Sequence, residues 1–151
     1  MDNESALNLD NQLCFAVYAC AREITKLYHP LLKQLGLTYT QYITLLVLWE
    51  ERRATVKHLG KRLYLDSGTL TPLLKKLEQM GLITRTRDPQ DERSVIVGLT
   101  ENGAAMKEKV RDIPQQLFCQ AGVAREEADA LRKQIVAMLA KVQGMTSSPA
   151  P

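Results

Sequence analysis

Apolar residues recur every three or four positions along most of the chain, and this spacing predicts helices. The first stripe covers residues 9–35 and consists of seven side chains, Leu13, Val17, Cys20, Ile24, Leu27, Leu31 and Leu35. Gly36 ends this helix, and Thr38 begins a second one that continues through Trp49. We therefore expect a long amphipathic helix followed by a shorter one.

Two further helices follow, and each begins after a residue type that caps helices. Thr55 precedes the short helix Val56–Leu63, and Asp66 precedes a helix that runs to Met80. Gly81 then stands where a helix C-terminus favours a left-handed residue. The side chains expected on the buried face of the second of these helices are Leu70, Leu73, Leu74 and Leu77.

The spacing then changes to that of strands. Short β-branched runs at residues 82–86 and 94–99 flank a charged turn, which is the pattern of a two-stranded hairpin with a polar tip. A helix, a short turn, a second helix and a hairpin form the layout of a winged helix-turn-helix. Residues 55–99 are therefore expected to be a DNA-binding core.

Helical spacing returns after the hairpin. Thr100 and Asn102 can cap a fifth helix that ends near residue 120, and Pro114 should kink or break it. A sixth helix is expected over residues 125–142. The last residues, 145–151, are expected to be a disordered tail.

The long helices at residues 9–36 and 102–142 have more apolar surface than the core at residues 55–99 can cover. We expect them to form a homodimer interface, whose twofold axis would match a palindromic operator. The expected fold class is mainly α with a small β-hairpin wing (α+β), as a single domain over residues 1–151.

Composition is that of an ordinary globular protein, with 45% hydrophobic and 25% charged residues in 151. No apolar run reaches 18 residues and the first ten residues are acidic and polar, so we expect neither a membrane span nor a secretory signal, and a cytoplasmic location. The cysteines and histidines show no paired-ligand spacing, so no metal and no cofactor is expected. His29 and His58 are interpreted as surface or interface residues.

Charge points to the segment that would face DNA. Residues 55–93 hold eight basic and five acidic side chains, a difference that equals the net charge of +3 of the whole chain. The candidate DNA contacts on the second helix of the motif are hydroxyls, a close-approach glycine and exposed lysines: Ser67, Gly68, Thr69, Thr71, Lys75 and Lys76. The alternative is that Asp66, Ser67 and Thr69 only cap the helix.

The hairpin adds arginines to this surface. Arg85 and Arg87 lie on one strand, and Arg93 follows the tip, from which a guanidinium could enter the minor groove. Asp91 is placed to hold that guanidinium by a bidentate pair, although a solvated turn would look the same in the sequence. Together with the charge, the hairpin favours DNA binding.

The stretch TVKHLGKRLYLDSGTLTPLLKKLEQMGLITRTRDPQDERSVIVGLT resembles the winged helix of MarR-type transcriptional regulators, including the DERS wing tip. Residues 11–50, with NQLCF and LTYTQY, resemble the organic hydroperoxide resistance regulators within that family. The resemblance implies a non-enzymatic repressor of transcription that organic hydroperoxides release from DNA. It also implies that Cys14 senses the peroxide and that Tyr28 and Tyr39 hydrogen-bond its sulfur.

Geometry adds a condition to the implied sensor. Cys14 lies near the start of the first helix, where the positive end of the helix dipole favours a thiolate. Tyr28 is 14 residues further on, about 21 Å along a straight helix, so the phenol and the sulfur cannot meet within one chain. The tyrosines must then come from the partner subunit. Cys20 lies on the apolar stripe and is interpreted as a core residue.

Cys119 matches the position of the resolving cysteine in the two-cysteine type of these regulators. The resemblance implies that oxidised Cys14 forms a disulfide with Cys119 of the partner subunit and that this rotates the wings. A packed interface thiol is the alternative for Cys119. For the whole chain, the alternatives are a MarR-type regulator of a small apolar or phenolic ligand in the dimer crevice, a thiol peroxidase, and a dimeric adaptor that does not bind DNA.

Overall fold

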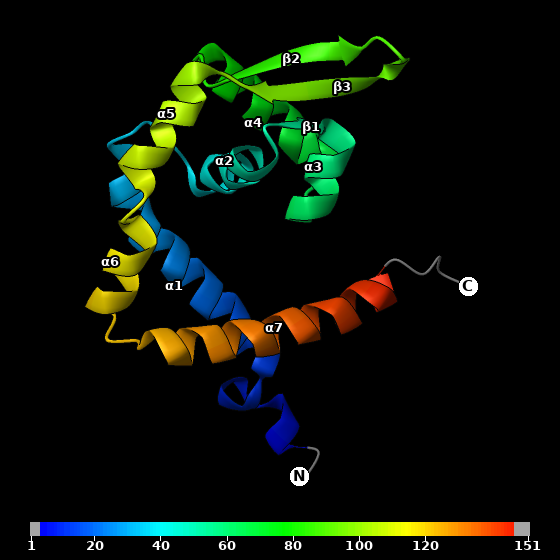
Figure 1. Cartoon of the computed structure of the whole chain (residues 1–151). Coiled ribbons are helices and arrows are strands. Elements are labelled where there is room, and N and C mark those ends of the chain that lie inside the picture. The colour runs from blue at the N-terminus through cyan, green and yellow to red at the C-terminus, as the bar shows by residue number, and fades with distance from the viewer. Residues whose placement is uncertain (1–3, 147–151) are drawn as a thin grey trace. The chain divides into compact units, whose positions relative to one another are not determined.

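A computed structural model of the chain describes residues 4–146 (Figure 1). The elements in chain order are η1 (Ser5–Leu7), η2 (Leu9–Asn11), α1 (Leu13–Lys33), α2 (Tyr39–Glu51), β1 (Arg53–Thr55), α3 (Val56–Leu63), α4 (Ser67–Gln79), β2 (Ile83–Asp88), β3 (Asp91–Leu99), α5 (Glu101–Val110), α6 (Ile113–Gln120) and α7 (Arg125–Thr146). The described residues up to Arg111 form one compact unit, and those from Asp112 on form a second.

Side-chain caps fix where four of the helices begin. Thr38, Thr55, Asp66 and Thr100 each accept a hydrogen bond from the backbone N–H three residues later, which satisfies one of the free donors of the first turn. Gly81 has a φ of +75°, as the end of α4 requires. The predicted stop and the caps at these four residues are therefore confirmed, whereas Asn102, also expected to cap the fifth helix, lies inside α5.

Apart from shifts of one or two residues at their ends, the predicted helices differ from the observed ones in three places. Residues 9–11 are a short 3-10 helix, and α1 begins only at Leu13. The expected fifth helix is two helices, because Pro114 lies in the first turn of α6, where its missing N–H costs nothing. α7 continues to Thr146, so the prediction of a disordered tail is wrong for residues 145–146. The rest of that tail, residues 147–151, lies outside the described residues.

The hairpin belongs to a three-stranded antiparallel sheet of order β1-β3-β2. β2 and β3 pair from Ile83 opposite Leu99 to Arg87 opposite Val95, and an irregularity follows at the tip. β1, which was not predicted from the sequence, pairs Ala54 with Val97. It joins the wing to the start of α3. The predicted fold class, mainly helical with a hairpin wing, is confirmed.

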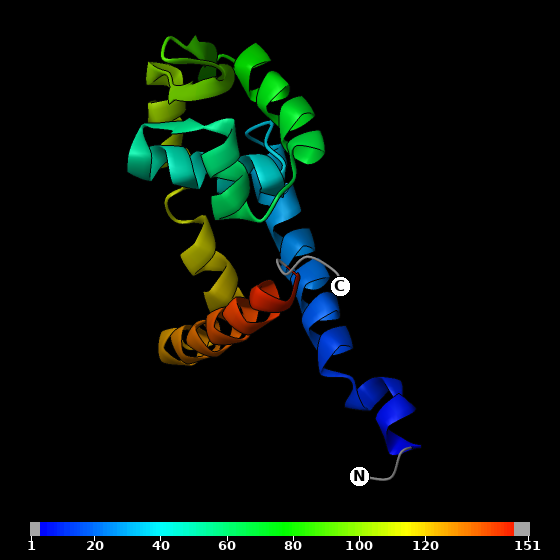
Figure 2. The ribbon, with the colours of Figure 1, turned by 90° about the vertical axis from the view of Figure 1, so that its right-hand side faces the viewer.

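The winged helix, defined here as β1 to β3 with α3 and α4, has its core within one chain. Leucines from α2, α3 and α4 and residues from the wing base are almost fully buried: Leu45, Leu48, Leu59, Leu70, Leu74, Leu77, Ile83 and Val97. The predicted buried face of α4 is confirmed. Figure 2 shows these elements gathered at one end of α1.

The long helices leave their apolar faces uncovered within a single chain. Of α1, only Tyr28 and Leu32 are buried, and α7 has no buried residue over Arg125–Thr146. Large apolar side chains exposed on these two helices include Leu13, Phe15, Leu27, Leu131, Ile135, Val136 and Val142. Among the helices of residues 4–146, none is both long and apolar enough to cross a bilayer.

Candidate DNA-binding surface and thiol site

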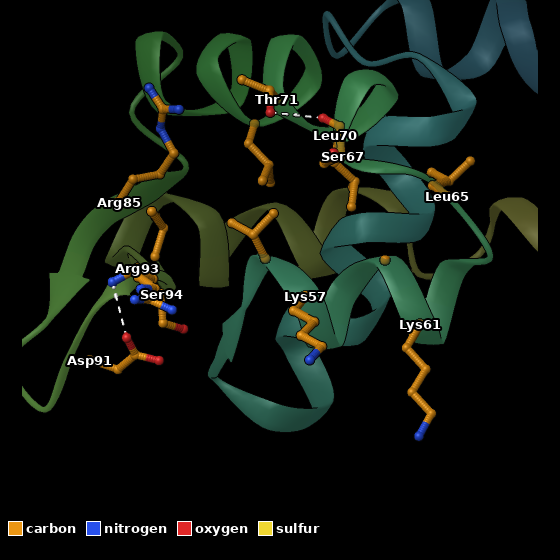
Figure 3. A pocket seen from close by; sticks show the side chains of 14 residues that line it. Lys57, Lys61, Leu65, Ser67, Leu70, Thr71, Arg85, Asp91, Arg93 and Ser94 are labelled. Atoms are coloured by element: carbon orange, nitrogen blue, oxygen red, sulfur yellow. Dashed lines mark hydrogen bonds between the residues drawn. The ribbon is translucent and has the colours of Figure 1, made fainter.

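A concave groove of about 710 Å³ lies between α3, α4 and the wing (Figure 3). Lys57 and Lys61 line it from α3, and Arg93 lines it from β3. Its floor is apolar, with Leu70 and Leu74 from α4. Cations around a groove lined by a helix N-terminus are suited to the phosphate backbone of a duplex.

The N-terminus of α4 supplies hydroxyls to this groove. The Asp66 carboxylate accepts a bond from the Thr69 N–H at 2.7 Å, and the Thr69 amide and hydroxyl hold the pKa of this carboxyl below its ordinary value. Thr71 donates its hydroxyl to the Ser67 carbonyl at 2.8 Å. Asp66 is therefore a cap, while the side chain of Ser67 lines the groove and Gly68 is exposed beside it. Direct base contacts by these residues stay a prediction.

Of the six predicted DNA contacts on α4, Ser67 and Thr71 line the groove and the other four do not. Gly68 and Thr69 are exposed at the start of the helix. Lys75 and Lys76 are exposed, as expected, but neither lines the groove. The first turns of α4 therefore face the groove, whereas Lys75 and Lys76 in its second half face solvent.

Arg85 is tied to the protein itself. Its guanidinium lies 3.1 Å from Glu78 Oε1, and its backbone N–H donates to Glu78 Oε2 at 3.1 Å. The hydrogen bond from Arg85 holds the pKa of Glu78 below its ordinary value. This pair was not predicted from the sequence. It fixes β2 against α4 and leaves Arg85 only partly available to DNA.

The wing tip differs from the prediction. Asp91 Oδ1 accepts the backbone N–H of Arg93 at 3.1 Å, and the expected bidentate pair with the guanidinium is not formed. The short Asp91 side chain readily accepts a hydrogen bond from the backbone N–H two residues later, as aspartates in turns commonly do. This bond stabilises the turn at the wing tip. Arg93 is exposed, and within residues 4–146 its guanidinium has no ion pair. Arg87 donates to the Glu92 carbonyl at 3.4 Å.

The three thiols are free and exposed within the described chain. Cys14 lies in the first turn of α1 and Cys119 near the end of α6. Cys20 is also exposed, so its predicted core position is wrong for a single chain. The stripe on which Cys20 lies is apolar, as predicted. The buried residues of α1, however, are Tyr28 and Leu32, which lie near its C-terminal end.

Tyr28 and Tyr39 meet at the far end of α1 from Cys14. Their ring centroids are 5.1 Å apart, and Tyr42 joins them at 5.6 Å from Tyr28 and 6.0 Å from Tyr39. Burial raises the pKa of all three phenols, so each keeps its proton at neutral pH. The structure thus brings the two predicted tyrosines together. Tyr42 was missed, although it follows Tyr39 by three residues, one helical turn, in LTYTQY.

An ion-pair cluster links α2 to α3 on the surface. Glu51 accepts from His58 at 2.9 Å and from Arg62, which also pairs with Glu50 at 3.1 Å. His58 and His29 are both exposed, as expected of surface residues. No group of three or more potential ligands among the described residues is placed to hold a metal.

Comparison with known proteins agrees with this architecture. Residues 26–110 match the family described as transcriptional regulator SarA/Rot. The chain is 54% identical over 127 residues, 84% of each chain, to the organic hydroperoxide resistance transcriptional regulator of Bacillus subtilis (strain 168).

Solved structures give the same result. Reduced AbfR bound to DNA aligns with a TM-score of 0.81 at 36% identity, covering 97% of this chain and 100% of that one. Disulfide-formed AbfR aligns at 0.64 and 35% identity, over 96% and 97%. A mutant MarR from E. coli in complex with operator DNA aligns at 0.75 and 26% identity, over 84% and 93%. The chain belongs to the MarR-type family of winged-helix transcriptional regulators, in the branch of the organic hydroperoxide resistance regulators.

Proposed function

We propose that this chain acts in the cytoplasm as a homodimeric repressor that organic hydroperoxides release from a pseudo-palindromic operator. The observation that carries the proposal is the placement of the sensor groups. An exposed thiol, Cys14, and a cluster of phenols lie at opposite ends of α1. The similarity to the B. subtilis organic hydroperoxide regulator supports this role.

DNA would bind across the groove between α3, α4 and the wing. Ser67 and Gly68 would approach the major groove at the N-terminus of α4, while Lys57 and Lys61 would contact phosphates. Arg93, which is exposed at the wing, would enter the minor groove. Of the other predicted contacts, Thr69, Thr71, Lys75, Lys76 and Arg87 would support this binding, and Asp91 would shape the turn.

Sensing would proceed by thiol oxidation. The Cys14 thiolate attacks one peroxide oxygen, the O–O bond breaks, and the other oxygen leaves as an alcohol after taking a proton. Cys14 becomes a sulfenic acid. The thiolate of Cys119 of the partner subunit then attacks that sulfur, forming a disulfide and releasing water once the leaving hydroxide is protonated. Disulfide-formed AbfR, a similar chain, supports this second step.

The phenols would come from the second subunit. Cys14 and Tyr28 are about 21 Å apart along α1, so Tyr28 and Tyr39 of the partner subunit would donate to the sulfur. Such donation stabilises the thiolate. Dimerisation would therefore build the sensor from two incomplete halves.

The test uses an operator selected from random duplex DNA and a gel mobility shift with and without cumene hydroperoxide. The parent should bind and be released by the peroxide, whereas Cys14→Ser should bind and stay bound. Cys20→Ser, which removes another exposed thiol from the same helix, is the matched control and should behave as the parent. Release of Cys14→Ser by the peroxide would refute thiol sensing.

The disulfide step has its own test. Peroxide-treated parent protein should run as a covalent dimer on a non-reducing gel, and Cys119→Ser should run as a monomer. Thiol reduction should restore operator binding in the parent. A covalent dimer that persists in Cys119→Ser would show that another thiol resolves Cys14.

A further inference from the structure

Ala21 lies halfway between the thiol and the phenols of α1, seven residues after Cys14 and seven before Tyr28. Positions seven residues apart differ by only about 20° around an α-helix, so the three side chains follow one face of α1. Ala21 is about 10.5 Å along the helix from each of the other two. Cys14 and Ala21 are exposed, whereas Tyr28 packs against Tyr39. Ala21 is therefore the midpoint of this face both along the helix and around it.

Twofold symmetry decides what faces this midpoint. In the proposed function each Cys14 meets the phenols at Tyr28 of the partner subunit, and one twofold axis makes both contacts at once. Tyr39 is only partly buried, so the phenol cluster has a side that a second chain can approach. Two exchanged contacts at the two ends of α1 require the two α1 helices to run antiparallel. The axis passes halfway between the contacts, so Ala21 faces Ala21 of the partner subunit.

The surface of α1 is hollowed around this midpoint. A hollow of about 460 Å³ is lined by six exposed residues of the helix, Tyr18, Ala21, Arg22, Thr25, Lys26 and His29. Ala21 has the smallest of these side chains, and Thr25 follows it by one turn. How closely two helices approach depends on the side chains at their contact, so the closest approach to α1 is possible here.

Three polar side chains around the hollow have partners on α1 itself. The Thr25 hydroxyl donates to the backbone carbonyl four residues earlier at 2.7 Å. Arg22 lies 5.4 Å from the centre of the Tyr18 ring, and its Nη1 donates to the Tyr18 hydroxyl at 3.3 Å. Lys26 pairs with Glu23 at 2.7 Å. A second helix can therefore cover the middle of the hollow without leaving the Thr25 hydroxyl unpaired.

We propose that α1 pairs antiparallel with α1 of the partner subunit through this hollow, and that Ala21, on the twofold axis, sets how closely each Cys14 approaches the phenols of the other subunit. The inference rests on the proposed function. Packed helices lie about 8–10 Å apart, with the distance set by the side chains between them. Because both thiol sites lie at the ends of one pair of helices, a single contact on the axis spaces both alike. Ala21 is thus a positioning residue.

Disulfide cross-linking tests the pairing. Ala21→Cys is made in the full-length chain with Cys14→Ser, Cys20→Ser and Cys119→Ser, so that the introduced thiol reports alone. A disulfide needs Cα atoms within about 7 Å, and two thiols on the axis meet this condition. Lys26→Cys is the matched control, because it lines the same hollow but would lie about 15 Å along the helices from its counterpart. With diamide, Ala21→Cys should form the covalent dimer at least roughly tenfold faster on a non-reducing gel.

A larger side chain at the axis tests the spacing. In protein with Cys20→Ser and Cys119→Ser, Ala21→Leu should part the helices and slow oxidation of Cys14 by cumene hydroperoxide about tenfold, the effect of weakening a hydrogen bond to a thiolate. The midpoint of the rate against pH should move upward, because the phenols stabilise the thiolate less. Ala21→Ser, which stays small, should keep the parent rate. Ala16→Leu, the same change on an exposed residue of the opposite side of α1, is the matched control and should also keep it.

Two results would overturn the proposal. One is equal cross-linking of Ala21→Cys and Lys26→Cys. The other is a dimeric Ala21→Leu that oxidises at the parent rate with an unmoved pH midpoint. If Ala21→Leu does not fold as a dimer, the cross-linking decides. Failure of the proposed function is a separate result, since it shows as peroxide release of Cys14→Ser from the operator, whereas the cross-linked protein contains no Cys14.

Discussion

The winged helix and the long helices differ in how much apolar surface one chain covers. Leu77 and Val97 in the winged helix have 0% exposure, whereas Leu131 on α7 is 51% exposed. The DNA-reading unit is therefore complete in a single chain. The proposed sensor is not, because Cys14 and the phenols of Tyr28 and Tyr39 lie at opposite ends of α1. A DNA-binding unit whose core is complete within one chain can move as a rigid body when a site formed between two chains changes.

The largest effect is expected where the second chain must cover α7. Leu131→Glu with Ile135→Glu places two carboxylates on that apolar face, and burying them in an interface is unfavourable. The protein should become a monomer by sedimentation while its winged helix stays folded. Operator affinity should fall roughly a hundredfold or more, since two half-site contacts no longer act together.

The control for this variant is Lys133→Glu, which puts a carboxylate on the opposite side of α7. It should remain dimeric. If Leu131→Glu with Ile135→Glu also stays dimeric, or if it unfolds the winged helix, then the apolar face of α7 is not what separates the two regions.

The next largest effect is expected at the winged helix, whose core is complete within one chain. A Cβ at Gly103, in the first turn of α5, would stand 2.1 Å from the Leu82 carbonyl oxygen at the base of the wing. Gly103→Ala must therefore push backbone from backbone, and we expect the free energy of unfolding to fall by about 3 kcal/mol. Gly144→Ala in α7, where a Cβ meets nothing within 4 Å, should leave it unchanged or slightly higher. Denaturant titration of both variants measures the difference.

Local features of the winged helix could be predicted from the sequence because each depends on a few neighbouring residues. Thr55 and Asp66 cap their helices with bonds to an N–H three residues away. Leu70, Leu74 and the rest of the buried face of α4 follow from a helical period alone. In such cases the chemistry and the spacing decide the structure together.

Contacts between segments could not be predicted in this way. β1 has three residues and exists because Ala54 pairs with Val97, far along the chain. Cys20 lies on an apolar stripe as predicted, but the period of a helix does not say which chain covers its face. Tyr42 joins Tyr28 and Tyr39 in one cluster of phenols only because α2 returns beside Tyr28. The fold was therefore easier to predict than the site.

Within the winged helix, two arginines should respond differently to truncation. Arg93 is exposed at the wing, so Arg93→Ala should weaken operator binding about tenfold and lower the salt slope of log K by about one. Arg85 is bound to Glu78, so Arg85→Gln should lower the free energy of unfolding and change the salt slope of operator binding less than Arg93→Ala does. Fluorescence anisotropy at several salt concentrations measures both. Equal slopes for Arg93→Ala and the parent would remove the wing from the DNA contact.

The smallest effect tests the Glu78–Arg85 pair that closes β2 onto α4. Arg85 holds the pKa of Glu78 below its ordinary value of 4.5, so the ionised carboxylate stabilises the fold at higher pH. This stabilisation is lost as the pH falls through the lowered value. Glu78→Gln should therefore flatten the acid side of unfolding free energy against pH, and Arg85→Gln should flatten it equally. Both variants remove the same interaction, so the double variant should be no less stable than either single variant. A further loss of unfolding free energy in the double variant would mean that the two side chains act separately.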